Sequence, residues 1–306
     1  MKLAIFNPIL YHMTLEESLK YMVSLGVKAM ELGCGGYPGT KHADVSELYK
    51  DADKRKRLQD TFAKYGVEIV ALSVHGNPVH PDRKTADTAA AELDQAITLA
   101  HQMNVPTVVG FSGCPGDGVS KCPNWVTCAW PTEFGQLLEW QWNEVLIPFW
   151  KAKAKAAADA KVRIAIEMHP GFTVHNPSSM MRLRRAAGDA VGANFDPSHL
   201  IWQGVNVAEA VKYLKGAIHH VHAKDTMFNE NIKAYKGVLD TDPYEGVESR
   251  SWFFRSVGYG AGDFKGLISS LRMTGYGGPV SIEHEDPLYS PQEGLERAVR
   301  NLQGLL

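Results

Sequence analysis

Acidic and histidine side chains stand at the ends of four short apolar segments in the second half of the chain. The segments read RIAIEMHPG, GANFDPSHL, HHVHAKD and VSIEHEDP, and they place Glu167, Asp196, His222 and Glu283 where each apolar run stops. Buried parallel strands are nearly continuous apolar runs, so a charged residue at the last position of each strand needs a reason. If the four strands are neighbours in a closed barrel, their carboxyl ends meet at one mouth and these side chains converge.

Three carboxylates that converge in a partly desolvated pocket repel one another and take up protons unless a cation joins them. One imidazole with three carboxylates is a hard ligand set made mostly of oxygen, and it indicates one divalent metal ion held by Glu167, Asp196, His222 and Glu283. Mn²⁺ is the favoured ion, with Mg²⁺, Co²⁺, Fe²⁺ or Zn²⁺ as alternatives. The competing interpretation is that each residue is a separate rim residue in an ion pair, but four in register on adjacent strands favour the metal.

Further polar residues lie beside these strand ends and are expected to bind substrate. His199 follows Asp196 past a proline, Lys224 follows His222, and His169 follows Glu167; His75 ends an earlier apolar run. The alternative is that each of them hydrogen-bonds to a metal ligand and fixes the orientation of that ligand. Glu285 is a spare ligand candidate, and Glu31 at the end of MELGCGG is a weaker instance of the same pattern.

Eight apolar runs that alternate with helical patterns predict a (β/α)₈ barrel formed by residues 1–306 as a single domain. The predicted strands are Lys2 to Phe6, Ala29 to Gly33, Glu68 to Val74, Thr107 to Phe111, Arg163 to Met168, Gly192 to Asp196, His219 to His222 and Pro279 to Glu283. The predicted helices are Leu15 to Leu25, Val45 to Tyr65, Lys84 to Met103, Gly135 to Ala160, Ser178 to Ala187, Val207 to Lys215, Phe264 to Thr274 and Pro291 to Leu305.

The connection after the seventh strand, residues 224–263, is long and lacks clear periodicity. A connection of this length in a compact domain is usually a lid or a binding element. Its Trp252 is expected to cover a sugar ring, with a small core under the loop as the alternative, and Arg250 and Arg255 are expected to bind an anionic group of the substrate.

Composition bounds the function. A net charge of -2 over 306 residues gives no overall field for nucleic acid or an anionic membrane. The chain contains no GxGxxG or Walker-type loop, so no nucleotide cofactor is expected. No apolar run approaches a membrane span, which favours a soluble cytoplasmic protein. Cys114, Cys122 and Cys128 share one Gly/Pro-rich loop, but they lack the close pairs of a zinc ribbon.

At IEMHPG, NFDPSHL, HVHAKD and SIEHEDP, in that order, the sequence resembles the xylose-isomerase-like barrels, in particular the sugar phosphate isomerase/epimerase family. That group includes ketose 3-epimerases, inosose isomerase and inosose dehydratase, and the resemblance spans nearly the whole chain. It implies a metal on the same four residues, Glu167 and Glu283 as the acid/base pair on opposite faces of the substrate, and His199 on a substrate oxygen.

The expected function is therefore a metal-dependent isomerase or epimerase that acts through an enediolate on a small ketose, keto-sugar or inosose. The alternative on the same scaffold is a dehydratase or lyase acting on an inosose or keto-glycoside. A non-catalytic sugar-binding barrel and an abasic-site nuclease are weaker alternatives. The expected partner is a small sugar or inositol, and not nucleic acid or a membrane. The sequence leaves open whether the protein forms a homo-oligomer.

Overall fold

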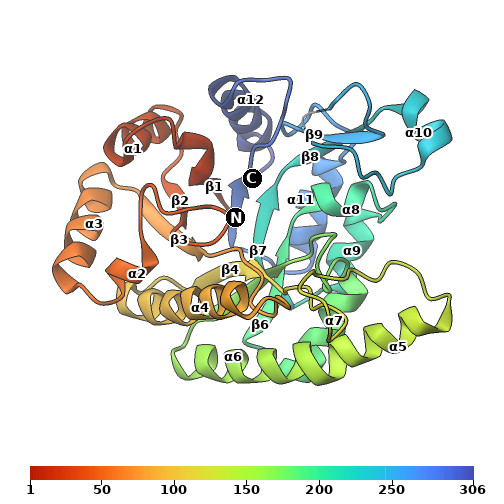
Figure 1. Ribbon diagram of the computed structural model, residues 1–306. Coiled ribbons are helices and arrows are strands. Elements are labelled where there is room, and N and C mark those ends of the chain that lie inside the picture. The colour runs from red at the N-terminus through yellow and green to blue at the C-terminus, as the bar shows by residue number, and fades with distance from the viewer. Residues whose placement is uncertain (245) are drawn as a thin grey trace.

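Eight parallel strands close into a barrel, as the sequence predicts, in the computed structural model, which describes residues 1–244 and 246–306 (Figure 1). The order around the barrel is β1-β10-β7-β6-β5-β4-β3-β2. The strand bounds are β1 Lys2–Phe6, β2 Ala29–Gly33, β3 Glu68–Ser73, β4 Thr107–Phe111, β5 Arg163–Glu167, β6 Val191–Phe195, β7 Ile218–Ala223 and β10 Pro279–Ile282. All eight lie where the apolar runs place them, so the predicted fold class is confirmed.

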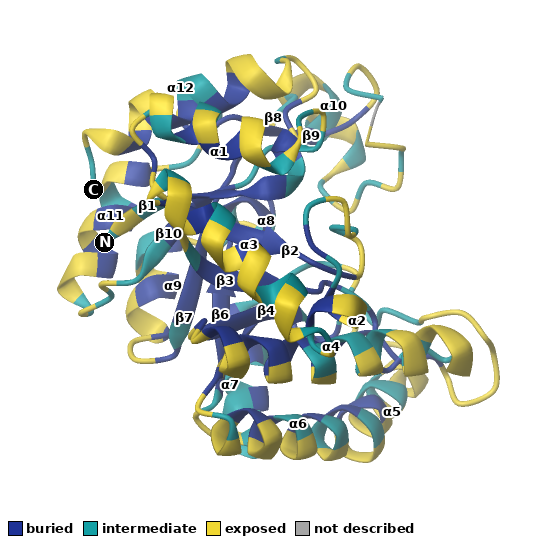
Figure 2. Cartoon of the chain, turned by 90° about the vertical axis from the view of Figure 1, so that its left-hand side faces the viewer, coloured by how far each residue is buried: buried dark blue, intermediate teal, exposed yellow. Residues whose placement is uncertain are grey.

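The strands are buried and the helices around them are amphipathic. Figure 2 shows buried residues along the barrel and on the inner faces of the helices, with exposed residues on the outer faces. This division follows from the sequence, since parallel strands covered by helices need apolar residues on both faces and the helices need them on one. The helices thus enclose one large apolar core that runs around the barrel.

The main helices are α1 Leu15–Ser24, α3 Ala52–Tyr65, α4 Arg83–Met103, α5 Thr132–Trp140, α6 Ile147–Asp159, α7 Pro177–Ala187, α9 Val207–Tyr213, α11 Phe264–Met273 and α12 Pro291–Gln303. Side chains that cap helix starts fix several of these bounds. The Thr14 side chain accepts from the Glu17 amide while Glu17 accepts from the Thr14 amide, and Asp263 and Ser290 cap α11 and α12.

Two predicted helices have a different form. The single helix predicted over 45–65 is two, α2 Val45–Leu48 and α3, because the Asp51 carboxylate caps a new start by accepting from the Lys54 amide. The helix predicted over 135–160 begins earlier, at Thr132, and has a π-helical stretch, Gln141–Leu146, between α5 and α6. There the buried Gln141 amide donates to three carbonyl oxygens of the loop after β4, so the irregular stretch anchors that loop.

Residues 224–263 contain more regular structure than the sequence predicts. β8 Asp225–Phe228 and β9 Trp252–Arg255 form a two-stranded antiparallel sheet, and α10 Glu230–Lys236 lies between them. In Figure 1 these elements lie together at the upper right, across from α5. The role of this segment as a substrate lid stays a prediction.

One carboxylate holds the end of this segment. The buried Asp225 side chain accepts hydrogen bonds from the backbone amides of Thr226, Gly258, Gly260 and Gly262 at 2.8 to 3.1 Å. A Cβ at Gly260 would lie 2.4 Å from the Asp225 Oδ1 atom, so the glycines of GYGAG let the backbone approach this carboxylate. The motif therefore wraps an internal side chain.

The cysteine loop and the helices give two further results. All four cysteines are free thiols, Cys34 and Cys114 buried and Cys122 and Cys128 exposed, and none belongs to the metal-capable clusters among the described residues. Among all the described residues, no helix is long and apolar enough to cross a bilayer.

Candidate metal centre

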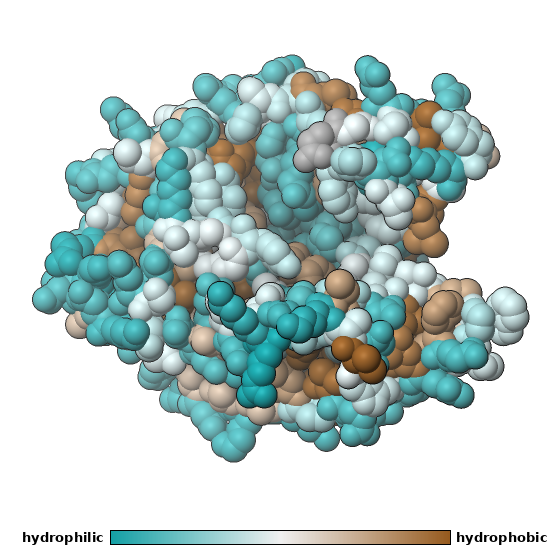
Figure 3. Space-filling model, viewed as in Figure 1, coloured by the Kyte–Doolittle hydropathy of each residue, from teal (hydrophilic) through white to brown (hydrophobic). Residues whose placement is uncertain are grey.

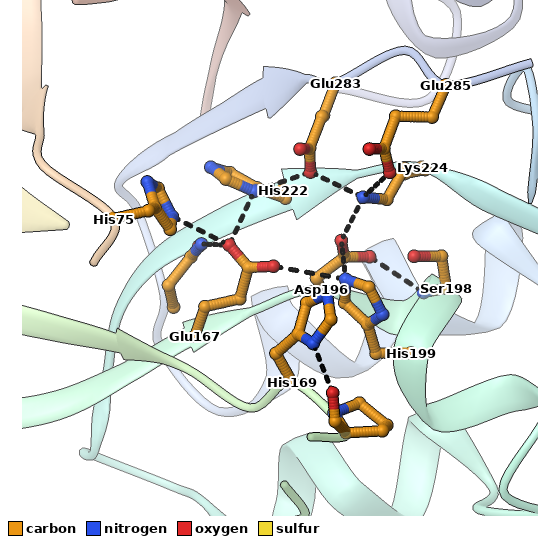
Figure 4. Close-up of polar contacts among 12 residues, drawn as sticks. His75, Glu167, His169, Asp196, Ser198, His199, His222, Lys224, Glu283 and Glu285 are labelled. Carbon is orange, nitrogen blue, oxygen red and sulfur yellow. Dashed lines mark hydrogen bonds and ion pairs between the residues drawn. The ribbon is translucent and has the colours of Figure 1, made fainter. Parts of the chain in front are cut away.

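Four side chains from four adjacent strands meet at the carboxyl end of the barrel. Glu167 ends β5, Asp196 follows β6, His222 lies in β7 and Glu283 follows β10 (Figure 4). One donor atom from each lies within 4.8 Å of the others. The His222 Nδ1 atom is 3.0 Å from Glu283 Oε2 and 3.3 Å from Glu167 Oε2. The convergence expected from the four apolar segments is therefore present.

The two carboxylate oxygens of Asp196 have different surroundings. Asp196 is the N-cap of α8, Pro197–Ile201, a short helix that is not among the predicted ones, and its Oδ1 accepts from the Ser198 amide at 2.8 Å. Its Oδ2 is fully buried and has no hydrogen-bond partner among the described residues; it lies 3.4 Å from both His199 Nε2 and Lys224 Nζ. A buried carboxylate oxygen without a hydrogen bond is costly, and the Lys224 ammonium at 3.4 Å offsets only part of that cost, so a metal ion at this atom would be favourable.

Glu167 lies at the centre of the polar cluster. His75 Nε2 is 2.9 Å from its Oε2, the Asn194 amide donates to the same oxygen at 3.1 Å, and His199 Nε2 is 3.1 Å from its Oε1. Burial by itself would raise the pKa of Glu167, but the hydrogen bonds from the surrounding histidines hold it well below its usual value. Glu167 therefore stays a carboxylate at neutral pH.

Lys224 is a second source of positive charge in this pocket. Its ammonium is buried, 2.9 Å from Glu283 Oε2 and 2.7 Å from Glu285 Oε2, and it lies over the Phe254 ring. Burial would raise the pKa of Glu283, but Lys224 and His222 together lower it to about 2. The sequence predicts a metal ion among the carboxylates, and the structure adds that the Lys224 ammonium already offsets part of their charge.

The site opens into a cavity of about 490 Å³, within the range of small-molecule sites. Glu167, Glu283, His75, His169 and Lys224 line it, together with apolar and aromatic residues. Those residues are Phe6, Pro8, Ile9, Tyr37, Pro38, Phe111 and Pro291. Figure 3 shows a hollow with hydrophilic side chains in the middle of the viewed face. A cavity lined by both apolar and polar side chains suits a ring that has both CH faces and hydroxyl groups.

Four of the predicted substrate residues lie around this centre. His75, His199 and Lys224 contact its carboxylates, and His169 packs on His199 with ring centroids 4.0 Å apart. Burial, with the neighbouring His199 as a further cause, lowers the pKa of His169 to about 3, so its imidazole is neutral.

The three predicted substrate residues of the long segment lie elsewhere, and none lines the cavity among the described residues. Trp252 stacks on Trp202 at 4.6 Å in a small core, which favours the alternative of a core beneath the loop. Arg255 Nε donates to Asp286 at 3.0 Å, and the buried Arg250 donates to the Asp242 and Trp252 carbonyl oxygens. Their role in binding substrate stays a prediction.

Sequence reasoning missed several contributors. Asn194 lies two residues before Asp196 on β6, and His220 lies two residues before His222 on β7. Side chains two apart on a strand share a face, so this spacing was the available signal. Glu31, considered only as a weak rim candidate, is fully buried and contacts both His220 and His222.

The donor set fits a divalent ion. It offers three carboxylates and one imidazole nitrogen within reach of one another, and Asp196 Oδ2 has no hydrogen-bond partner in the described structure. The hard oxygen donors match Mn²⁺ or Mg²⁺, and the imidazole also suits Zn²⁺, Fe²⁺ or Co²⁺.

Comparison with known proteins places this geometry in a family. The family described as xylose isomerase-like TIM barrel matches residues 19–305. Over 99% of this chain and 98% of its own length, the Bacillus subtilis (strain 168) protein YfiH, named as uncharacterized, is 35% identical. An inosose dehydratase of Clostridium botulinum (strain Eklund 17B / Type B) is 30% identical over 54% of each chain.

Solved structures agree on the fold. The crystal structure of the IOLI protein with a bound zinc atom superposes with a TM-score of 0.70 at 19% identity, covering 100% of this chain and 98% of that one. Other solved neighbours carry the titles of ketose 3-epimerases. Because the family matches residues 19–305 and the chain forms the closed eight-stranded barrel, the protein belongs to the xylose isomerase-like TIM barrel family.

Proposed function

We propose that this protein is a divalent-metal-dependent sugar isomerase or epimerase that acts through an enediolate on a small ketose, keto-sugar or inosose. Glu167 and Glu283 are the acid/base pair, and Mn²⁺ is the proposed ion, held with Asp196 and His222. The whole chain acts as one domain, with residues 224–263 as the substrate cover.

The observation that carries the proposal is the placement of the two glutamates. Glu167 on β5 and Glu283 after β10 are separated around the barrel by β6 and β7, and both line the same cavity. A carboxylate on each side of a bound sugar can remove a proton from one face and return one to the other face or to the adjacent carbon. The first outcome is epimerisation and the second is isomerisation.

The surrounding groups keep both glutamates ionised and oriented. His75 and Asn194 hold Glu167, while His222 and Lys224 hold Glu283. A divalent ion bound by the four residues would supply Lewis-acid stabilisation of the charge that develops on the substrate oxygens. The Lys224 ammonium lines the cavity and can donate hydrogen bonds to substrate hydroxyl groups. The neutral His169 also lines it, and because its Nδ1 hydrogen faces the Pro170 carbonyl oxygen, its Nε2 can accept a hydrogen bond from a substrate hydroxyl group.

The second candidate is a dehydratase or lyase with the same residues. It is supported by the 30% identity to an inosose dehydratase over half of each chain, and by Lys224, whose ammonium lies at the cavity where it can protonate a departing hydroxyl group. The two candidates share the first deprotonation and differ in whether the substrate loses water.

The test is an activity screen of chelator-treated protein reloaded separately with Mn²⁺, Mg²⁺, Co²⁺, Fe²⁺ or Zn²⁺. Ketoses, inososes and keto-glycosides are incubated in D₂O, and products are resolved by mass spectrometry and NMR. We expect a product of unchanged skeleton with deuterium at one carbon, and at least a hundredfold loss of turnover in Glu167→Gln and in Glu283→Gln. A product lighter by water identifies the lyase instead.

A matched control is Glu144→Gln, the same change at an exposed residue of the π-helical stretch, which should leave turnover unchanged. Full turnover in Glu283→Gln would overturn the acid/base assignment. Absence of bound metal and of any thermal shift with Mn²⁺ would overturn the metal-dependent function as a whole.

A further inference from the structure

A second layer of polar side chains lies inside the barrel, next to the proposed metal ligands. Glu31 of β2, Ser73 of β3, His220 of β7 and Ser281 of β10 are all fully buried. Glu31 is the centre of the layer: its Oε1 accepts from the Ser73 hydroxyl at 2.5 Å, and its Oε2 lies 2.8 Å from His220 Nε2. The Ser281 hydroxyl lies 2.9 Å from the same His220 nitrogen. The mechanism proposed above uses none of these four residues.

His222 joins this layer to the metal ligands because its two ring nitrogens face opposite ways. Its Nε2 lies 3.0 Å from both carboxylate oxygens of Glu31. Its Nδ1 lies 3.0 Å from Glu283 and 3.3 Å from Glu167, on the side where the four donor atoms meet (Figure 4). One imidazole thus bridges a buried carboxylate and the candidate metal centre.

The two contacts determine where the ring hydrogen lies. A nitrogen that faces two carboxylate oxygens at hydrogen-bond distance must carry a hydrogen, since a lone pair there would repel them. When Nδ1 gives its lone pair to a metal ion, the one remaining ring hydrogen is therefore on Nε2 and is donated to Glu31. Partners of this kind behind a ligating histidine fix its tautomer and ring orientation and raise its basicity as a ligand.

We propose that Glu31 is a positioning residue of the metal centre: it holds His222 with the hydrogen on Nε2, so that Nδ1 is the metal-binding nitrogen. Ser73 and His220 in turn hold the Glu31 carboxylate. This inference rests on the proposed metal centre, but it concerns a residue that does not contact the ion. It also explains why the buried strand β2 contains the charged residue Glu31, since the other residues of this strand are apolar or glycine.

The competing arrangement is a second ion. One donor atom each from Glu31, His220 and His222 lie within 4.8 Å of one another, so the three could hold a cation themselves. The contacts favour the positioning role, because Glu31 already has hydrogen-bond partners on both oxygens and His222 has only one nitrogen on that side. A single bound ion per chain is therefore expected.

The experiment compares Glu31→Gln with wild type. Manganese affinity and stoichiometry are measured by calorimetric titration of chelator-treated protein. We expect one ion per wild-type chain and about 10- to 100-fold weaker binding in Glu31→Gln. Ser73→Ala, a milder change that leaves the carboxylate in place, should weaken binding about 2- to 10-fold. Glu92→Gln is the control, since this half-buried glutamate accepts from the Gly36 amide and makes no hydrogen bond with a histidine among the described residues.

Proton NMR of protein labelled with ¹⁵N-histidine distinguishes a positioning role of Glu31 from a purely structural role. The Nε2 hydrogen of His222, identified by its absence in His222→Gln, should give a strongly downfield signal in metal-free and Mg²⁺-loaded wild type. In Glu31→Gln that signal should move upfield. The Glu92→Gln spectrum should match wild type.

Three results would overturn the inference. They are unchanged Mn²⁺ affinity in Glu31→Gln, a wild-type His222 with no hydrogen on Nε2, and two ions per wild-type chain of which Glu31→Gln loses one. If wild type binds no metal at all, the proposed function fails, and the NMR signal still decides whether Glu31 orients His222.

Discussion

The Asp225 carboxylate allows a direct test of which contacts stabilise the conformation of residues 224–263. Four backbone amides donate to it, two at Oδ1 from Thr226 and Gly262 and two at Oδ2 from Gly258 and Gly260. Asp225→Asn keeps the shape of the side chain but replaces one acceptor oxygen with an NH₂ group. In either orientation of the amide, two backbone N–H groups then face a donor.

The size of the effect follows from these contacts. A hydrogen bond to a charged group contributes about 1.5 to 3 kcal/mol, so two lost bonds would cost about 3 to 6 kcal/mol. Burial raises the pKa of Asp225, which means that removing its charge relieves some desolvation, and this places the expected loss near 3 kcal/mol. With an unfolding entropy of about 2 cal/mol/K per residue, a chain of 306 residues should lose about 5 °C in Tm.

The assay is thermal unfolding followed by circular dichroism, with hydrogen exchange measured at Gly258, Gly260 and Gly262. The matched control is Asp263→Asn, where the carboxylate accepts from the Gly266 amide alone as the cap of α11; stability should fall by less than about 0.5 kcal/mol, because asparagine caps a helix about as well as aspartate. Because β8 and β9 carry Phe254 over the Lys224 ammonium, Asp225→Asn should also raise KM. The reasoning is refuted if both variants melt within 1 °C of each other and the three glycine amides keep their protection.

Three further outcomes are expected. Asp196→Asn should weaken Mn²⁺ binding at least a hundredfold in calorimetry, because it neutralises a ligand whose buried oxygen has no hydrogen-bond partner in the described structure; wild-type affinity would contradict this. Lys224→Met should tighten Mn²⁺ binding about tenfold, because it removes an ammonium 2.9 Å from Glu283 that competes with the ion; weaker binding would show that Lys224 supports the centre. Burial lowers the pKa of His219 to about 4, so its contribution to stability is present above pH 6.5 and is lost as pH falls towards 4. Between pH 7 and pH 5 the free energy of unfolding, measured with urea, should fall by about 2 kcal/mol more in wild type than in His219→Asn. The exposed control His101→Asn should show the same fall as wild type.

The barrel was predictable because its signal is local. Each strand is a short apolar run bounded by polar or glycine residues, and closure follows from eight such runs separated by helices. The four metal-ligand candidates were predictable for the same reason, since each is a charged residue at the end of its own run. Caps such as Thr14 with Glu17 also lie within one turn, and the structure has the reciprocal bonds that the spacing predicts.

The remaining features depend on contacts between residues distant in sequence. Glu31 meets His222 191 residues later, and nothing in the spacing of MELG indicates that partner. Asp225 binds glycines 33 to 37 residues ahead, so GYGAG could not be assigned to it from periodicity. Lys224 was expected on the substrate, and only the distances to Glu283 and Glu285 identify it as a counter-charge.

The charge balance of the pocket favours a metal centre over a purely ionic cluster. Glu167, Asp196 and Glu283 meet the Lys224 ammonium and the imidazoles of His75, His199 and His222, which carry positive charge only when they are protonated. With neutral imidazoles, negative charge is in excess, and the excess is not shared evenly. The pKa of Glu167 is well below its usual value and that of Glu283 is about 2, whereas burial raises the pKa of Asp196 despite the nearby Lys224. Asp196 is thus the least compensated of the three carboxylates, and its Oδ2 atom has no hydrogen-bond partner in the described structure, so a divalent ion shared by the four residues would relieve the largest cost there.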